Sequence, residues 1–166
     1  CSKSGMTPLH MGVGDPRQTR LLLEAGADCN VKDNNGCMPL HIASRIGSTD
    51  TVKLLLKNGA AIDARDSKGM TPLLDAVADA RIGSARILIE HGADVDARSN
   101  NGFAPLHFAC MRPGTAGVQL VDLLLANGAR SDVATHAGKL PADIAQSKEV
   151  RRMLRQAGPQ RPDQGD

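Results

Sequence analysis

The stretch 33–65 arranges apolar, polar and glycine positions in an order that predicts a pair of helices. Pro39 is suited to the start of the first helix, because proline is tolerated in a first helical turn. Gly47 and Ser48 then interrupt the pattern and predict a turn, and residues 51–57 form the second helix with an inner face of leucines. Gly59 predicts the end of this helix, because glycine adopts a left-handed backbone at no steric cost.

This layout recurs along the chain at a nearly constant interval. Gly36 has counterparts at steps of 33 residues in Gly69 and Gly102, a further one 36 residues on in Gly138, and one 31 residues earlier in Gly5. The repeats also share a short segment, which reads Thr7-Pro8-Leu9-His10, Pro39-Leu40-His41-Ile42-Ala43, Thr71-Pro72-Leu73 and Pro105-Leu106-His107-Phe108-Ala109. A period of 33 residues with a Thr-Pro-Leu-His-x-Ala signature is typical of ankyrin repeats, and the chain resembles that family over roughly residues 2–157.

The resemblance implies an all-α fold, an ankyrin-repeat solenoid of stacked helix-turn-helix pairs with β-hairpin fingers between them. We expect one ankyrin repeat domain over residues 1–158 and a flexible tail over 159–166. Asn35-Gly36 and Asn101-Gly102 predict the turns of two fingers, because both residue types tolerate positive φ. The expected units are about 2–32, 33–65, 66–98, 99–134 and a C-terminal cap at 135–158.

Three repeats depart from the common layout. In the first, Asp15 and Pro16 predict a capped start of the second helix. In the third, the turn sequence lies three residues later, at 81–84, which predicts a longer first helix and a shorter second one; Leu74 also replaces the signature histidine. In the fourth, three additional residues around 112–115 include Pro-Gly, which predicts a loop protruding between the helices.

Composition restricts the classes of function. The net charge is +2, too small to indicate nucleic acid or a membrane by itself. No apolar run approaches the roughly 18 residues of a membrane span. The four cysteines are irregularly spaced, which favours free thiols in a reducing, intracellular compartment, cytoplasmic or nuclear. We expect a monomer, and the start without Met, part-way into a repeat, indicates a piece of a longer protein.

The sequence lacks the residue patterns typical of catalytic, cofactor or metal sites. The resemblance implies that His10, His41 and His107 are buried residues that hydrogen-bond the signature threonine and the backbone. A role as bases or metal ligands is the alternative. Cys37 and His41 lack the second pair that zinc requires, and the pattern at 94–96 lacks the further oxygen ligands of a calcium loop. We therefore predict no catalysis, no cofactor and no metal.

Positions that the repeat architecture leaves exposed are the candidate partner-binding residues. Four apolar positions follow the finger turns, a basic row precedes them, and further residues end the first helices. Burial against neighbouring fingers is the alternative for the apolar positions, and pairing with Asp33 and Asp66 is the alternative for the basic row. Apolar contacts flanked by cations predict a groove for an extended, partly acidic partner segment. The three sets are Met6, Cys37, Met70 and Phe103; Lys32, Arg65 and Arg98; and Arg45, Met111 and Arg112.

The predicted function is a protein–protein interaction module that binds this partner segment on its fingers and concave helix face, as part of a scaffold or adaptor protein. Asn30 resembles the hairpin site that an asparaginyl hydroxylase modifies in some ankyrin repeats, and stabilisation of the hairpin is its alternative role. Two other functions stay open. One is a regulatory domain that packs against the rest of its parent; the other is a weak nucleic-acid binder, which the scarcity of aromatic platforms disfavours.

Overall fold

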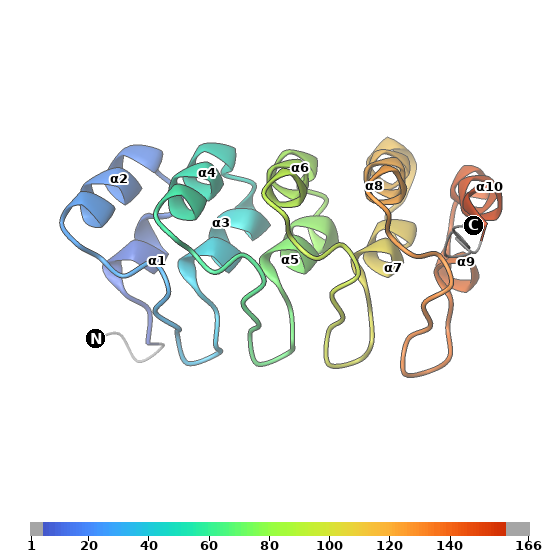
Figure 1. Cartoon of the computed structure of the whole chain (residues 1–166), viewed down its shortest axis with the longest axis horizontal. Helices are drawn as coiled ribbons and strands as arrows, with labels where there is room; N and C mark the ends of the chain where they lie inside the picture. The colour runs from blue at the N-terminus through green and yellow to red at the C-terminus, as the bar shows by residue number, and fades with distance from the viewer. Residues whose placement is uncertain (1–4, 159–166) are drawn as a thin grey trace, which may run out of the picture.

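The computed structural model describes residues 5–158, and these form ten helices stacked in five consecutive pairs (Figure 1). The chain is therefore an all-α solenoid, as the repeats predict. The expected tail at 159–166 lies outside the described residues. The helices are α1 (Pro8–Gly12), α2 (Pro16–Glu24), α3 (Pro39–Ile46), α4 (Thr49–Lys57), α5 (Pro72–Ala78), α6 (Ile82–Glu90), α7 (Pro105–Cys110), α8 (Gly114–Ala126), α9 (Pro141–Ile144) and α10 (Lys148–Ala157).

The helices form two layers. The first helices of the pairs, α1, α3, α5, α7 and α9, lie in one row, and the second helices lie in a parallel row above them in Figure 1. The loops that join one pair to the next project beyond the row of first helices, on the side away from the second helices. The first helices therefore form an inner layer between the outer helices and these loops, which we call fingers.

Each first helix begins at a proline that follows an extended residue, and three of these starts are secured by the signature histidine. The imidazole Nδ1 accepts a hydrogen bond from the N–H of the residue before the proline, at 3.1 Å for both Met38 to His41 and Ala104 to His107. The Nε2 atom faces a carbonyl of the next finger, 3.1 Å from Met70 O in the case of His41. Because Nδ1 accepts, Nε2 carries the proton. Each histidine thus links two repeats, which confirms the structural interpretation even where threonine is absent.

The core lies between successive pairs. Leu40 of α3, Leu73 of α5 and Leu106 of α7 are fully buried, as are Leu55 and Leu88 of the outer layer. Repeats of this kind bury their apolar faces only against neighbours, so a terminal unit needs a polar outer face. In the last pair, α10 buries Val150 and Leu154 and exposes a run of charged residues, and the role of this pair as a cap stays a prediction.

The fingers contain the expected turns but no β-strand within residues 5–158. In the second finger Gly36 N–H donates to Asp33 O, and Asp33 N–H donates to Cys37 O, which closes a short hairpin. Gly36 has a φ of 75°, a left-handed backbone that favours glycine. Adjacent fingers are joined by a backbone bond from Ser67 N–H to Asn35 O, repeated at the next two junctions. Too few bonds form along each finger to define a strand.

The prediction for the third repeat is wrong. Helix α5 has 7 residues against 8 in α3, and α6 has 9 residues like α4. The sequence 81–84 does not form the turn but caps and starts α6, with Arg81 as its N-cap residue. The turn lies earlier, where Ala80 has a left-handed φ of 55°; Gly47, at the same position of the repeat before it, is also left-handed, with a φ of 84°.

The protruding loop predicted for the fourth repeat is also wrong. Only residues 111–113 separate α7 from α8, and α8 is 13 residues long where α4 and α6 have 9. The additional residues therefore lengthen the outer helix at its N-terminal end. The Pro-Gly pair lies at the start of this helix: Pro113 is its N-cap residue, and Gly114, with a φ of 71°, is its first residue.

Candidate functional site

A hollow of about 360 Å³ lies where two fingers meet the inner helix layer, and we call it the finger groove. It spans three successive repeats. The fingers contribute Asp66, Lys68, Met70, Ser99, Asn101 and Phe103. The inner helices and their C-terminal ends contribute Arg45, Asp75, Phe108 and Met111.

Four of the predicted binding residues come together in this groove. Met70 and Phe103 are half-buried at the roots of neighbouring fingers, whereas Arg45 and Met111 are exposed at the ends of α3 and α7. The ring centroids of Phe103 and Phe108 are 5.5 Å apart at a tilt of 40°. The groove therefore has a thioether and aromatic wall beside a cation.

Other members of the predicted sets lie elsewhere. Met6 is half-buried in the first finger, and Arg112 is half-buried beside the groove without lining it. Cys37 differs from the expectation of an exposed apolar position, because it is buried with 7% of its surface exposed. Its thiol lies 3.9 Å from Asp66 Oδ2, and burial raises its pKa to about 11. The apolar surface along the fingers is therefore interrupted at the second finger.

The residues of the basic row hydrogen-bond backbone carbonyls of the next repeat, which the sequence did not predict. Lys32 Nζ donates to the backbone oxygen of Arg65, Arg65 to that of Arg98, and Arg98 to that of Ala134. Each cation thus bridges from its own repeat to the equivalent carbonyl of the next. The alternative of pairing with Asp33 and Asp66 is not what forms: within residues 5–158 the one ion pair is Arg130–Asp132, at 3.1 Å. Side chains used as bridges contribute less to a partner surface.

Asn30 also bridges two repeats. Its Oδ1 accepts from Ala61 N–H at 2.8 Å, and its Nδ2 donates to Gly59 O at 3.0 Å. At the equivalent positions Asp63 accepts from Asp94 N–H, and Asp96 accepts from Arg130 N–H. This ladder supports the stabilising role for Asn30, and its hydroxylation stays a prediction.

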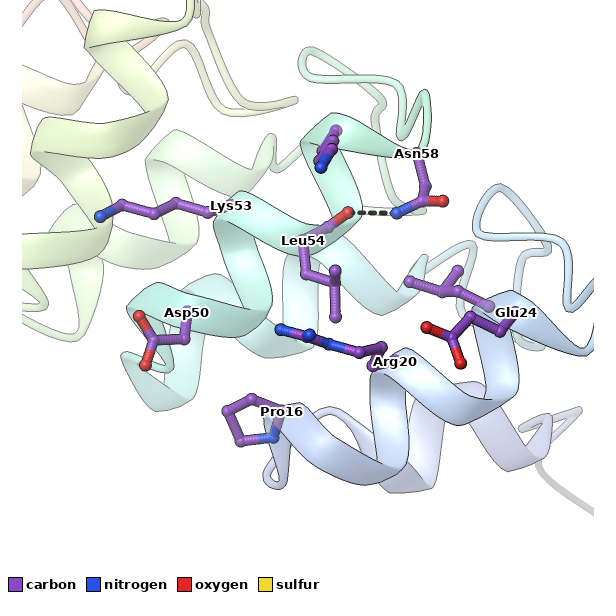
Figure 2. Close-up of a pocket in the computed structure, with 9 residues that line it drawn as sticks. Pro16, Arg20, Glu24, Asp50, Lys53, Leu54 and Asn58 are labelled. Atoms are coloured by element: carbon purple, nitrogen blue, oxygen red, sulfur yellow. Dashed lines mark hydrogen bonds between the residues drawn. The ribbon is translucent and has the colours of Figure 1, made fainter.

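A second and larger hollow, of about 570 Å³, lies between the outer helices α2 and α4 (Figure 2). Its charged residues are exposed and of both signs, among them Arg20, Glu24 and Lys53. The Asn58 amide caps its own helix by donating to Leu54 O at 2.8 Å. Because its charged side chains are exposed to water, this hollow has the features of an ordinary furrow between helices.

Asp75 is the groove residue that the sequence interpretation missed. Only 7% of its surface is exposed, and its Oδ2 is buried without a hydrogen-bond partner in the described part of the chain. Desolvation raises its pKa from 3.8 to about 7, Arg45 acts to lower it, and Asp66 and Asp79 act to raise it. The signal was the repeat register, since Asp75 stands where the neighbouring repeats have Ile42 and Phe108.

The described residues hold no group of three or more histidine, cysteine or acidic side chains arranged to bind a metal ion. Among the same residues, none of the helices combines the length and apolarity needed to cross a membrane. Cys29, Cys37 and Cys110 are free and buried. Burial raises the pKa of the Cys110 thiol to about 12, so it is protonated at neutral pH.

Paired helices, an inner layer and projecting turns define a helical-repeat solenoid. A family model described as "Ankyrin repeats (3 copies)" matches residues 9–99 and again 66–136. The chain belongs to the ankyrin repeat family, whose repeats generally mediate protein–protein interaction. Over 52 residues it is 44% identical to a protein described as "Potassium channel AKT3" from Oryza sativa subsp. japonica. This match covers 30% of the chain and 6% of the channel's length.

Proposed function

We propose that the chain is a non-catalytic binding module that holds an extended segment of a partner protein in the finger groove. One observation carries the proposal: the groove combines Met70, Phe103 and Met111 from successive repeats with the exposed cation of Arg45. Apolar side chains that stay accessible in a folded solenoid contribute free energy when a partner covers them. Methionine adapts its shape to such a partner.

The charges at the groove support the choice of an extended, partly acidic segment. Arg45 and Lys68 are exposed, and within residues 5–158 neither forms an ion pair. Acidic residues of a partner can pair with them at the rim, which contributes more to specificity and association rate than to affinity. The groove crosses three repeats, so an extended chain can follow it across the fingers. The channel similarity supports a domain within a larger protein, and our proposal is that this protein is a scaffold or adaptor of the cytoplasm or nucleus.

The basic row gives little support to the nucleic-acid alternative, because Lys32, Arg65 and Arg98 hydrogen-bond backbone carbonyls of the next repeat. Filter binding with an oligonucleotide at low and physiological salt tests it directly. Packing against another part of the parent protein uses the same groove chemistry, and a titration with the remaining parent segments supplied in trans tests that alternative.

The test is a pull-down from cell extract with the chain and two double variants, read by mass spectrometry. Met70→Ala with Phe103→Ala removes the groove wall, and Leu23→Ala with Leu54→Ala removes half-buried leucines of the outer hollow as a matched control. We expect proteins bound by the wild type to be lost with the groove variant and retained with the control. Equal capture by all three would contradict the proposal.

A further inference from the structure

Asp75 places a potential charge where the stack otherwise holds apolar side chains. The same position of the inner helix is Ile42 one repeat earlier and Phe108 one repeat later. Within residues 5–158, the buried side-chain oxygens without a hydrogen-bond partner are Asp75 Oδ2 and the hydroxyls of Ser44 and Ser84. Asp75 alone among these three can ionise, so it has the strongest need for a donor.

The neighbouring cations do not form an ion pair with Asp75. Arg45 and Lys68 line the same groove, yet neither approaches an Asp75 oxygen within 4.0 Å. Both are exposed, so water and salt screen their charges, whereas Asp75 is buried and its field is screened less. A cation that enters the groove is therefore attracted more strongly by Asp75 than it is repelled by the rim.

The rest of the groove fits the body of one particular cationic side chain. Phe103 and Phe108 present tilted rings at 5.5 Å between centroids. A guanidinium is planar, weakly hydrated and stacks on aromatic faces, and it meets a carboxylate with two parallel hydrogen bonds. Met70 and Met111 have flexible side chains that can move to admit it. An ammonium group is more strongly hydrated and matches these walls less well.

We propose that the finger groove contains an arginine subsite, in which Asp75 receives the guanidinium of a partner arginine between the methionine and phenylalanine side chains. This inference rests on the proposed function and names the chemistry of its partner. The segment it selects carries an arginine flanked by acidic residues, which pair with Arg45 and Lys68 at the rim. Asp75 thereby determines specificity, and the apolar wall supplies contact area.

The acid–base state of Asp75 gives the subsite a pH dependence. Its pKa of about 7 reflects desolvation, opposed by Arg45 and Lys68 and reinforced by Asp66 and Asp79. Phe108 of α7 and the residue that caps this helix, Met111, also line the groove and do not titrate. An arginine binds the ionised carboxylate better than the protonated one. Its affinity therefore rises with pH until Asp75 is fully ionised.

The experiment uses N-acetyl-arginine-amide as the probe and chain labelled with ¹³C at the methionine methyl groups, observed by NMR. We expect saturable shifts of Met70 and Met111, which line the groove, and no shift of Met153 in α10. N-acetyl-citrulline-amide has nearly the same shape without the charge and is expected to bind at least about tenfold more weakly, as loss of a charge-assisted hydrogen bond implies.

Two variants complete the test. Asp75→Asn keeps the shape, and because it relieves a buried charge it is expected to fold; it should weaken the arginine probe at least about tenfold and abolish its rise from about pH 6 to about pH 8. Glu90→Gln removes an exposed carboxylate at the end of α6, outside the groove, and should leave binding unchanged.

Equal binding of the citrulline probe, unchanged binding by Asp75→Asn, or no shift at Met70 and Met111 would each overturn the subsite. These results are independent of the pull-down. Loss of capture with the Met70 and Phe103 double variant together with a silent probe would retain the binding module and reject the arginine subsite.

Discussion

Replacing Asp75 by asparagine is expected to remove a large pH dependence from the stability of the stack. The folded pKa of Asp75, about 7, lies above the value of 3.8 for the free side chain. Between these values the folded chain binds more protons than the unfolded one, so the free energy of unfolding falls as pH rises. The stabilisation that the raised pKa of Asp75 gives the folded chain is fully present below pH 3.8, and it is fully lost above about pH 7.

The size of the effect follows from the two pKa values. A difference of about 3 units corresponds to about 4 kcal/mol in total, of which roughly 2.5 kcal/mol falls between pH 5 and pH 8. Asparagine cannot ionise, so the wild type should lose that amount relative to Asp75→Asn over this range. His41 and His107 have pKa values lowered by burial and act in the opposite direction. Because the wild type and Asp75→Asn both contain these histidines, their effect cancels when the two free energies of unfolding are subtracted.

Urea unfolding followed by circular dichroism at 222 nm measures this difference, because a chain without Trp and Tyr offers little intrinsic fluorescence. Repeat proteins can depart from two-state unfolding, so the slopes of the two transitions should first be shown to agree. Glu90→Gln, which removes an exposed carboxylate of α6, serves as the control, and its curve should stay parallel to that of the wild type. Parallel curves for Asp75→Asn would refute the conclusion that this carboxyl is desolvated in the groove.

Three further substitutions test the bridges between repeats. Arg98→Ala removes the bond to Ala134 O and should lower the free energy of unfolding by about 1 kcal/mol, with Arg86→Ala on the outer layer as a neutral control. Asn30→Ala should cost about 1–2 kcal/mol, whereas Asn30→Asp retains the acceptor for Ala61 N–H and should cost less; mass spectrometry of cellular protein for a gain of one oxygen tests its hydroxylation. His41→Leu should lower stability at neutral pH by about 1–3 kcal/mol, because Met38 N–H and Met70 O lose their partner. It should also reduce the stability loss below about pH 6.5, because a buried neutral imidazole has a lowered pKa; an unchanged acid transition would contradict this.

The repeat architecture could be predicted from sequence because local rules determine it. Within a helix, Pro39 fits only the first turn, and Gly36 adopts a left-handed φ without strain. The spacing at which such residues recur therefore predicts the spacing of the helix pairs. Helix boundaries in the third and fourth repeats were not predictable in this way. Ala80 adopts a left-handed φ that its residue type disfavours, and packing against the neighbouring repeats has to compensate for the strain.

The lining of the groove was predictable only in part, because the pattern gives the position of a residue in the repeat and not how deeply its side chain is buried. Met70 and Phe103 line the groove, yet Cys37 at the same position is buried. Likewise, the basic row could be recognised in the sequence. Its hydrogen bonds to carbonyls 33 or 36 residues further along could not, because they depend on how closely the repeats stack. Asp75 could have been found from its register, since an acid that replaces an apolar residue in one repeat of a stack requires a reason.

That reason connects stability with binding. The position of Asp75 is filled elsewhere in the stack by Ile42 and Phe108, side chains that require no hydrogen bond, so an apolar residue at 75 is compatible with the fold. An unpaired buried carboxylate destabilises the free chain, and a partner that supplies a donor relieves this when it binds. Relief that occurs only in the complex strengthens binding selectively for partners with the right donor. Asp75→Ile should therefore give a more stable chain above about pH 7 that no longer distinguishes the arginine probe from the citrulline probe.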